Sequence, residues 1–295
     1  MLLGVLLYRL GWLSDRMVRE LSLLVFRVGL PLVLFSGAIK VNYLLLGQAV
    51  YLLAGIVTTV LVLGAALLYA RLRGWHGENG AIFVQGAYRG NMGVMGVALC
   101  AAAYGEAGLA LAALPVAILT ILYNIIAVVL LNRVYGSNRS RLTWLRGIAL
   151  NPLIIGISAG VLVSLLQLPV PADVQRGLSM FASGFLPLAL IGIGASLNLR
   201  ALRGAGWLTL EAAAWKLVLA PALGVAVAVG LGIHGAELGV LFLLMAAPVA
   251  AASYIMVMAA GGNASLAANI VVLSTLLSAF TLTLGLALLQ WFGLF

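Results

Sequence analysis

The stretch AIFVQGAYRGNMGVMGVAL, from Ala81 to Leu99, has the length of a membrane-spanning helix but a polar, glycine-rich centre. An arginine, an asparagine and four glycines stand where lipid favours leucine. Glycine weakens a helix, and an ionisable side chain inside a bilayer is costly enough that it usually has a role. The stretch therefore predicts a transmembrane helix that is interrupted near its middle.

The composition is that of an integral membrane protein. Of 295 residues, 64% are hydrophobic and 8% are charged, whereas soluble domains have about half and a quarter. The apolar runs are close to the ~20 residues that a helical span needs, and longer than the ~10 alternating residues of a barrel strand. The sequence predicts an all-α membrane protein.

Ten apolar runs and their basic connections define the expected topology. The runs are residues 1–14, 20–39, 43–70, 80–103, 108–132, 148–168, 174–198, 206–231, 238–260 and 265–292. Eleven arginines lie in connections on one face: Arg9, Arg16, Arg19, Arg71, Arg73, Arg133, Arg139, Arg141, Arg146, Arg200 and Arg203. The other face has only Lys40 and Arg176. The positive-inside rule makes the arginine-rich face cytoplasmic and places both termini on the extracytoplasmic side of the inner (plasma) membrane.

The net charge of +9 does not indicate nucleic-acid binding. The arginines lie in short connections, and no cationic face with interleaved aromatics is present. The single cysteine, Cys100, is in an apolar run, which excludes an intramolecular disulfide and a CxxC metal site. We expect neither a cofactor nor a metal.

Short internal matches indicate a repeat. The tripeptide GVL begins at Gly4 and again at Gly160, and LPL begins at Leu30 and again at Leu186, both at an offset of 156 residues. At an offset of 157 residues, GEAGLA from Gly105 aligns with GNASLA from Gly262. Because each repeat has an odd number of spans, five, the second copy starts on the opposite side of the membrane and is inverted relative to the first, as in many secondary transporters. We predict a first repeat at 1–135, a basic cytoplasmic linker at 136–147 and a second repeat at 148–295.

The repeat offset also makes predictions about the N-terminus and about a second helix break. The counterpart of Asn151 and Pro152 falls before residue 1, so the first span is expected to lack one or two turns, with a genuinely short, interfacial first helix as the alternative. An offset of 157 aligns Asn91 with Pro248 in LLMAAPVAAASYIMVMAAGG, a second expected break. Two half-helix N-termini meeting at mid-membrane would present partial positive charge and N–H groups, which suits an anion.

These residues resemble the auxin efflux carrier family of bacterial and plant transporters. The resemblance rests on QGAYRGNMGVMG from Gln85, NPLIIG from Asn151, IGIGASL from Ile191, and AAPVAAASYIMVMAAGGNASLAANIVVLSTLLS from Ala246. It implies ten transmembrane helices in two inverted five-helix repeats, with broken crossover helices 4 and 9. It also implies transport of organic anions, such as auxin or dicarboxylates, by an elevator motion. The substrate is not identified by these motifs.

Six residues around the breaks are candidates for substrate binding: Arg89, Asn91, Gly93, Pro248, Ser253 and Tyr254. Arg89 either pairs with a substrate carboxylate or neutralises the carbonyl end of its own half-helix. Asn91 can donate to an anion and also satisfy unwound backbone. Ser253 and Tyr254 either supply hydroxyl donors or serve helix capping and packing. The glycine spacing that includes Gly93 permits two backbones to cross closely.

Two further ionisable residues are candidates for charge balance or coupling. Lys216 lies about three turns into the eighth span, near mid-membrane, and either balances substrate charge or pairs with an acid. Glu211 is the carboxylate well inside a span, so it is the first candidate for proton coupling. A snorkelling or interfacial glutamate is the alternative.

The pattern favours a carrier of a small organic anion by alternating access, with H⁺ or Na⁺ as the coupling ion to consider. A passive anion channel and a sodium-coupled organic anion symporter of the bile-acid-transporter type are the alternatives. An enzyme is disfavoured, because the only aspartates, Asp15 and Asp173, lie in connections and no histidine lies in a span. Direction of transport and a homodimeric assembly are left open.

Overall fold

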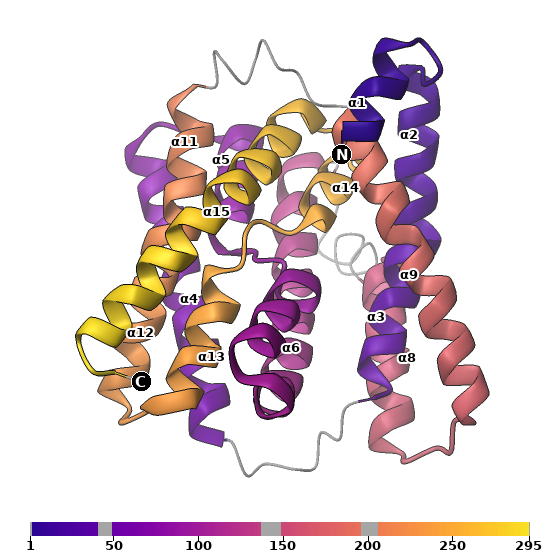
Figure 1. The fold of residues 1–295 in the computed structure, drawn as a ribbon. Coiled ribbons are helices and arrows are strands. Elements are labelled where there is room, and N and C mark those ends of the chain that lie inside the picture. The colour runs from indigo at the N-terminus through magenta and orange to yellow at the C-terminus, as the bar shows by residue number, and fades with distance from the viewer. Residues whose placement is uncertain (1, 41–48, 137–148, 196–205, 295) are drawn as a thin grey trace. The chain divides into compact units, whose positions relative to one another are not determined.

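The computed structural model describes residues 2–40, 49–136, 149–195 and 206–294, and all regular elements within these ranges are helical (Figure 1). The chain divides into two compact units, each described by itself below. Apart from Gly136, the predicted basic linker at 136–147 lies outside the described residues, and so do Arg200 and Arg203.

Unit 1 comprises Met1–Leu44, Asn124–Arg203 and Ala251–Ala268. Its described helices are α1 (Leu2–Arg9), α2 (Asp15–Leu24), α3 (Leu30–Ala38), α8 (Pro152–Leu165), α9 (Ala172–Ala195) and α14 (Ala251–Ala259), with the end of α6 and the start of α15. A π-helical turn, Val25–Gly29, joins α2 and α3 into one continuous run. The Asn151 side chain caps α8 by accepting a hydrogen bond from the Leu153 amide at 2.9 Å.

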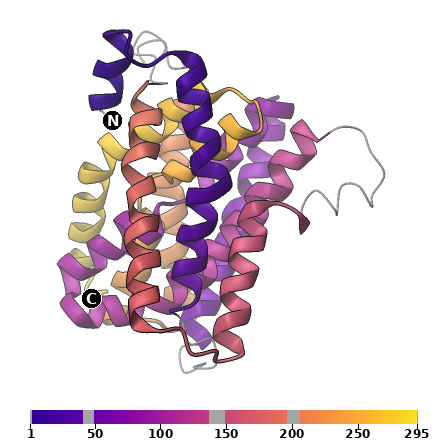
Figure 2. The ribbon, with the colours of Figure 1, turned by 90° about the vertical axis from the view of Figure 1, so that its right-hand side faces the viewer.

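Two close helix contacts form the centre of unit 1. Helix α3 packs on α8 and α1 packs on α9, and both pairs lie side by side in Figures 1 and 2. A methyl group on Gly160 would lie 2.8 Å from the Phe35 carbonyl oxygen, and one on Gly4 would overlap the Ile191 carbonyl oxygen. Both glycines allow helix backbones to touch, as small residues do in membrane helices.

Unit 2 comprises Leu45–Tyr123, Gly204–Ala250 and Asn269–Phe295. Its described helices are α4 (Ala49–Leu72), α5 (Gly77–Tyr88), α6 (Val97–Tyr135) up to Tyr123, α11 (Trp207–Ala214), α12 (Ala220–Gly230), α13 (Gly235–Ala246) and most of α15 (Ala264–Trp291). A π-helical turn at Met92–Gly96 precedes α6, and another at Trp215–Leu219 joins α11 to α12.

Five described runs are long and apolar enough to cross a membrane: Asp15–Ala38, Val50–Leu72, Leu114–Tyr135, Trp207–Gly230 and Ala264–Trp291. Three shorter apolar helices are Met92–Gly105, Pro152–Leu165 and Gly235–Ala246. The helices Met92–Gly105 and Gly235–Ala246 cover parts of the fourth and ninth predicted spans. Within α6, Gly105 has non-helical φ and ψ of 58° and −141° at the place where the sequence separates the fourth span from the fifth. The number ten and the inverted repeat stay predictions.

Two half-length helices of unit 2 set up the candidate site. Helices α5 and α13 have 12 residues each, and each starts at the glycine of a His-Gly pair, where φ is positive, 58° at Gly77 and 62° at Gly235. Positive φ is accessible to glycine at little cost. Helix α5 ends at Tyr88 and α13 ends at Ala246, so the chain leaves the helical path at both places where the sequence predicts a break.

Candidate functional site

The two unwound segments of unit 2 lie side by side and pair through their backbones (Figure 1). Gly90 and Val249 form an isolated antiparallel bridge. The Asn91 amide donates to the Pro248 carbonyl at 2.7 Å, and the Ala250 amide donates to the Arg89 carbonyl at 3.1 Å. We call this pair of segments, Arg89–Asn91 and Ala247–Ala250, the crossing. Backbone groups freed by the breaks thus satisfy one another, which an apolar environment requires.

A serine from α15 supports the crossing. The Val249 amide donates to the Ser274 hydroxyl oxygen at 3.1 Å, and this hydroxyl donates to the Val271 carbonyl at 3.0 Å. Ser274 is fully buried. Its signal in the sequence is a hydroxyl inside an apolar run, but such residues commonly bond to their own helix, so the sequence did not single it out.

Lys216 reaches the crossing from the π-helical turn at Trp215–Leu219. Its side chain is fully buried, and its ammonium donates to the Met245 carbonyl in the last turn of α13 at 2.6 Å. Within the described residues, no carboxylate lies within ion-pair distance of Lys216. Of the two roles considered for this residue, pairing with an acid is therefore not seen. The partner is the carbonyl end of a helix, which carries partial negative charge.

Gly90 lies directly against the end of the lysine side chain. A methyl group at this position would be 2.8 Å from Lys216 Nζ, 2.9 Å from its Cε and 3.1 Å from the Ala247 carbonyl oxygen. Gly96 likewise faces Leu244, whose Cδ2 would lie 2.9 Å from an added methyl group. Gly93 has no heavy atom of the described chain within 4 Å of that position. The expected close approach holds at Gly90 and Gly96 and is wrong at Gly93.

Arg89 and Asn91 flank the first break. Arg89 is the residue at which α5 ends, with extended φ and ψ of −87° and 92°, and its side chain is buried at 3% exposure. Asn91 precedes the π-helical turn, and its carbonyl accepts from the Met95 and Gly96 amides at 3.0 Å each. The Asn91 side chain makes no capping bond to that turn. The arginine therefore sits at a carbonyl end of a half-helix, as one of its two predicted roles requires.

Ser253 and Tyr254 belong to unit 1, on α14. Tyr254 is fully buried, and its hydroxyl donates to the Gly192 carbonyl of α9 at 3.1 Å. This bond ties α14 to α9. Ser253 is 4% exposed, and its hydroxyl has no hydrogen-bond partner among the described residues. The tyrosine thus has a packing and hydrogen-bonding role of its own. Of the two residues, Ser253 is the one whose hydroxyl makes no hydrogen bond in the described part of the chain.

Gln85 is a buried polar residue that the sequence did not single out. It lies one helical turn before Arg89, is 1% exposed, and neither its amide nitrogen nor its oxygen has a partner within the described ranges. The adjacent Gly86 packs against Ile270 of α15 and Ala212 of α11. Leaving a buried amide unpaired costs free energy. Gln85 therefore joins Arg89 and Asn91 as a candidate residue.

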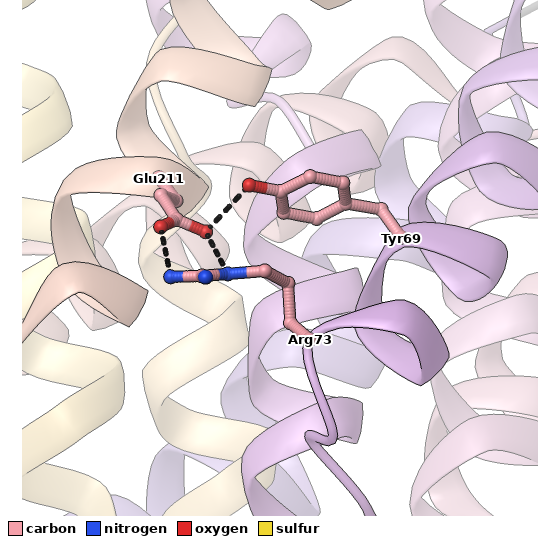
Figure 3. A network of polar contacts seen from close by, with 3 residues as sticks. All are labelled: Tyr69, Arg73 and Glu211. Atoms are coloured by element: carbon pink, nitrogen blue, oxygen red, sulfur yellow. Dashed lines mark hydrogen bonds and ion pairs between the residues drawn. The ribbon is translucent and has the colours of Figure 1, made fainter.

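Glu211 lies in a bonded cluster between α4 and α11 (Figure 3). Arg73 donates to both of its carboxylate oxygens, at 2.7 and 3.2 Å, and the Tyr69 hydroxyl donates to it at 2.8 Å. The side chains of Arg73 and Glu211 are 42% and 18% exposed. We call these three residues the Glu211 cluster. The carboxylate is thus bonded to an arginine and a tyrosine, and both interpretations of Glu211, as a coupling residue and as an interfacial glutamate, stay predictions.

No metal centre is visible in the part of the chain that the structure describes. Within those ranges, no three His, Cys, Asp or Glu side chains gather where a metal ion could bind. His76 and His234 precede α5 and α13 respectively, and their side chains accept no capping hydrogen bond from these helices. The chemistry available at the crossing is therefore that of buried cations, amides and backbone dipoles.

Comparison with known proteins indicates transport. The profile of the family described as "Membrane transport protein" matches residues 1–286. A protein of Rhizobium meliloti (strain 1021) named "Putative malonate transporter" is 30% identical over 213 residues. The match covers 66% of this chain and 64% of that protein, so the chain spans less than two thirds of the length of this relative.

Proposed function

Because the chain belongs to the membrane transport protein family, the family of the auxin efflux carriers, we propose that it is a secondary carrier of a small organic anion that works by alternating access of the elevator type. It is a multi-pass membrane protein, since five of its described helical runs can cross a bilayer. Malonate, named for the relative, is the first substrate to test.

The observation that carries the proposal is the crossing with its two buried cations. Arg89 is 3% exposed and Lys216 is fully buried, both in unit 2 beside unwound backbone. Intramembrane ionisable residues commonly mark a substrate path, and discontinuous helices form the sites of many secondary transporters. A carboxylate is the ligand chemistry that two such cations would attract. Asn91 and Gln85 add amide donors along the same half-helix end.

The proposal includes ten spans in two inverted repeats, and the contacts in unit 1 support it. Gly160 faces the Phe35 carbonyl and Gly4 faces the Ile191 carbonyl. Both glycines and both partners are separated by the predicted offset of 156 residues, so equivalent close contacts occur in the two halves. A division into two compact units is also what an elevator motion needs. We further propose that the protein lies in the inner membrane with both termini on the extracytoplasmic side, because the arginine-rich connections are expected to be cytoplasmic.

The test is uptake of labelled malonate and other carboxylates into proteoliposomes. Arg89→Ala should lower uptake at limiting substrate about tenfold or more, since a hydrogen bond to a charged group contributes about 1.5–3 kcal/mol. Arg27→Ala is the matched control, because Arg27 is an exposed arginine on another π-helical turn. Equal loss in both variants, or no loss in Arg89→Ala, would remove Arg89 from the site.

The same vesicles separate the carrier from the passive channel. A carrier exchanges labelled substrate for unlabelled substrate held inside, so preloading should speed uptake and the rate should saturate. A channel gives unsaturable flux and no counterflow. Proton, sodium and potential gradients, imposed one at a time, then identify the coupling ion. Light scattering of the purified protein tests for the homodimer.

A further inference from the structure

We propose that Lys216 is a built-in cation that takes the position of a coupling sodium ion at the crossing, so that transport proceeds without sodium. The inference rests on the proposed carrier function and decides between the coupling ions considered for it. In discontinuous membrane helices, unwound carbonyls and the C-terminal ends of half-helices are the groups that coordinate sodium. The question is which group meets those carbonyls in this chain.

The Lys216 ammonium meets one of them directly. It donates to the carbonyl of Met245, one residue before α13 ends, at 2.6 Å. The last carbonyls of a helix lack intrahelical partners and carry partial negative charge. An ammonium group is a compact point charge with three donors, so it can satisfy carbonyl oxygens much as a monovalent metal ion does.

The ammonium also lies against the other unwound segment. Gly90, which bridges to Val249, leaves just enough room for it, because a methyl group there would be 2.8 Å from Nζ and 3.1 Å from the Ala247 carbonyl oxygen. The cation thus lies between Gly90 of the crossing and the last turn of α13, all within unit 2. A site between two unwound segments is the kind of place where sodium would bind, and here a side chain fills it.

Charge balance agrees with this role. Among the described residues the one ion pair is that of Arg73 and Glu211, and Lys216 has no carboxylate within reach. The ammonium of Lys216 is bound by a carbonyl and not by an acid, so an arriving anion would be the group that offsets its positive charge. Sodium binding at this place would put two cations side by side, which is unfavourable.

The first experiment compares wild-type uptake in sodium and in choline at equal ionic strength. We expect equal rates, and sodium stimulation of the wild type would overturn the inference while leaving the carrier function intact. The second experiment removes the charge. Purified Lys216→Ala should melt at a lower temperature in choline chloride and recover by several degrees, saturably, in sodium chloride. Wild type should show no such sodium effect.

Lys40→Ala is the matched control, because Lys40 is the other lysine of the chain and is exposed. It should respond to neither ion. Lys216→Gln provides a second variant if Lys216→Ala does not fold, since its amide still offers a donor while the charge is gone. Absence of a sodium effect in the folded variants would overturn the inference. Melting requires no transport, so a sodium-specific gain in a protein that moves no anion would refute only the proposed function.

Discussion

The crossing and the Glu211 cluster handle a positive charge in opposite ways. Arg73 is 42% exposed and is neutralised by a carboxylate at 2.7 Å, whereas Lys216 is fully buried and meets only a helix-end carbonyl among the described residues. An exposed pair is screened and contributes little. The charge of a buried cation is hardly screened, and among the described residues no carboxylate offsets that of Lys216. This difference is the one that the proposed anion site requires, whereas the Glu211 cluster links Tyr69 and Arg73 to α11.

The largest effect on transport is expected where an added methyl group would push the Lys216 ammonium away from the Met245 carbonyl. In Gly90→Ala, the new group would displace the flexible end of Lys216 and break its bond to Met245. Loss of a hydrogen bond to a charged group costs about 1.5–3 kcal/mol, so initial transport rates should fall about tenfold or more. Gly93→Ala is the control, because nothing described lies within 4 Å of that position. Similar rates in the two variants would contradict the importance of the contact.

The next effect tests whether the pairing of unwound backbone matters. Ser274→Ala removes the acceptor of the Val249 amide, and a buried donor without a partner costs about 1–3 kcal/mol. We expect a lower melting temperature and slower transport. Ser278→Ala is matched, since Ser278 is also buried on α15 but bonds only to the Thr275 carbonyl of its own helix. If both serines proved equally dispensable, the support of the crossing by α15 would be refuted.

The smallest effect is expected in the Glu211 cluster. Glu211→Gln keeps hydrogen-bonding capacity but loses the ion pair. Exposed ion pairs contribute about 0–1 kcal/mol to the free energy of unfolding. A double-mutant cycle with Arg73→Ala measures that energy by thermal melting. We also expect uptake to respond to a proton gradient as in the wild type. Loss of that response in Glu211→Gln would instead make Glu211 the coupling carboxylate, the role that the sequence suggested first.

The positions of the breaks were predictable from the sequence because their causes are local. Glycine and proline disturb a helix wherever they occur, and Arg89 and Pro248 interrupt apolar runs whose ends are set by hydropathy. The spacing of the glycines did not reveal that Gly93, unlike Gly90 and Gly96, has no close neighbour among the described residues, and its role in substrate binding stays a prediction. Gln85 and Ser274 were passed over, because a lone polar residue in an apolar run usually bonds within its own helix.

The sequence by itself determined that this chain is a helical membrane protein and that its helices break near residues 90 and 248, and it predicted that the two halves repeat. These properties follow from hydropathy, from backbone chemistry and from spacing along the chain. Only the tertiary structure decided the partners: Lys216 with a carbonyl 29 residues away, and Glu211 with an arginine 138 residues away. Apolar helices carry little information about which faces meet, so the partner of a buried charge is fixed by packing.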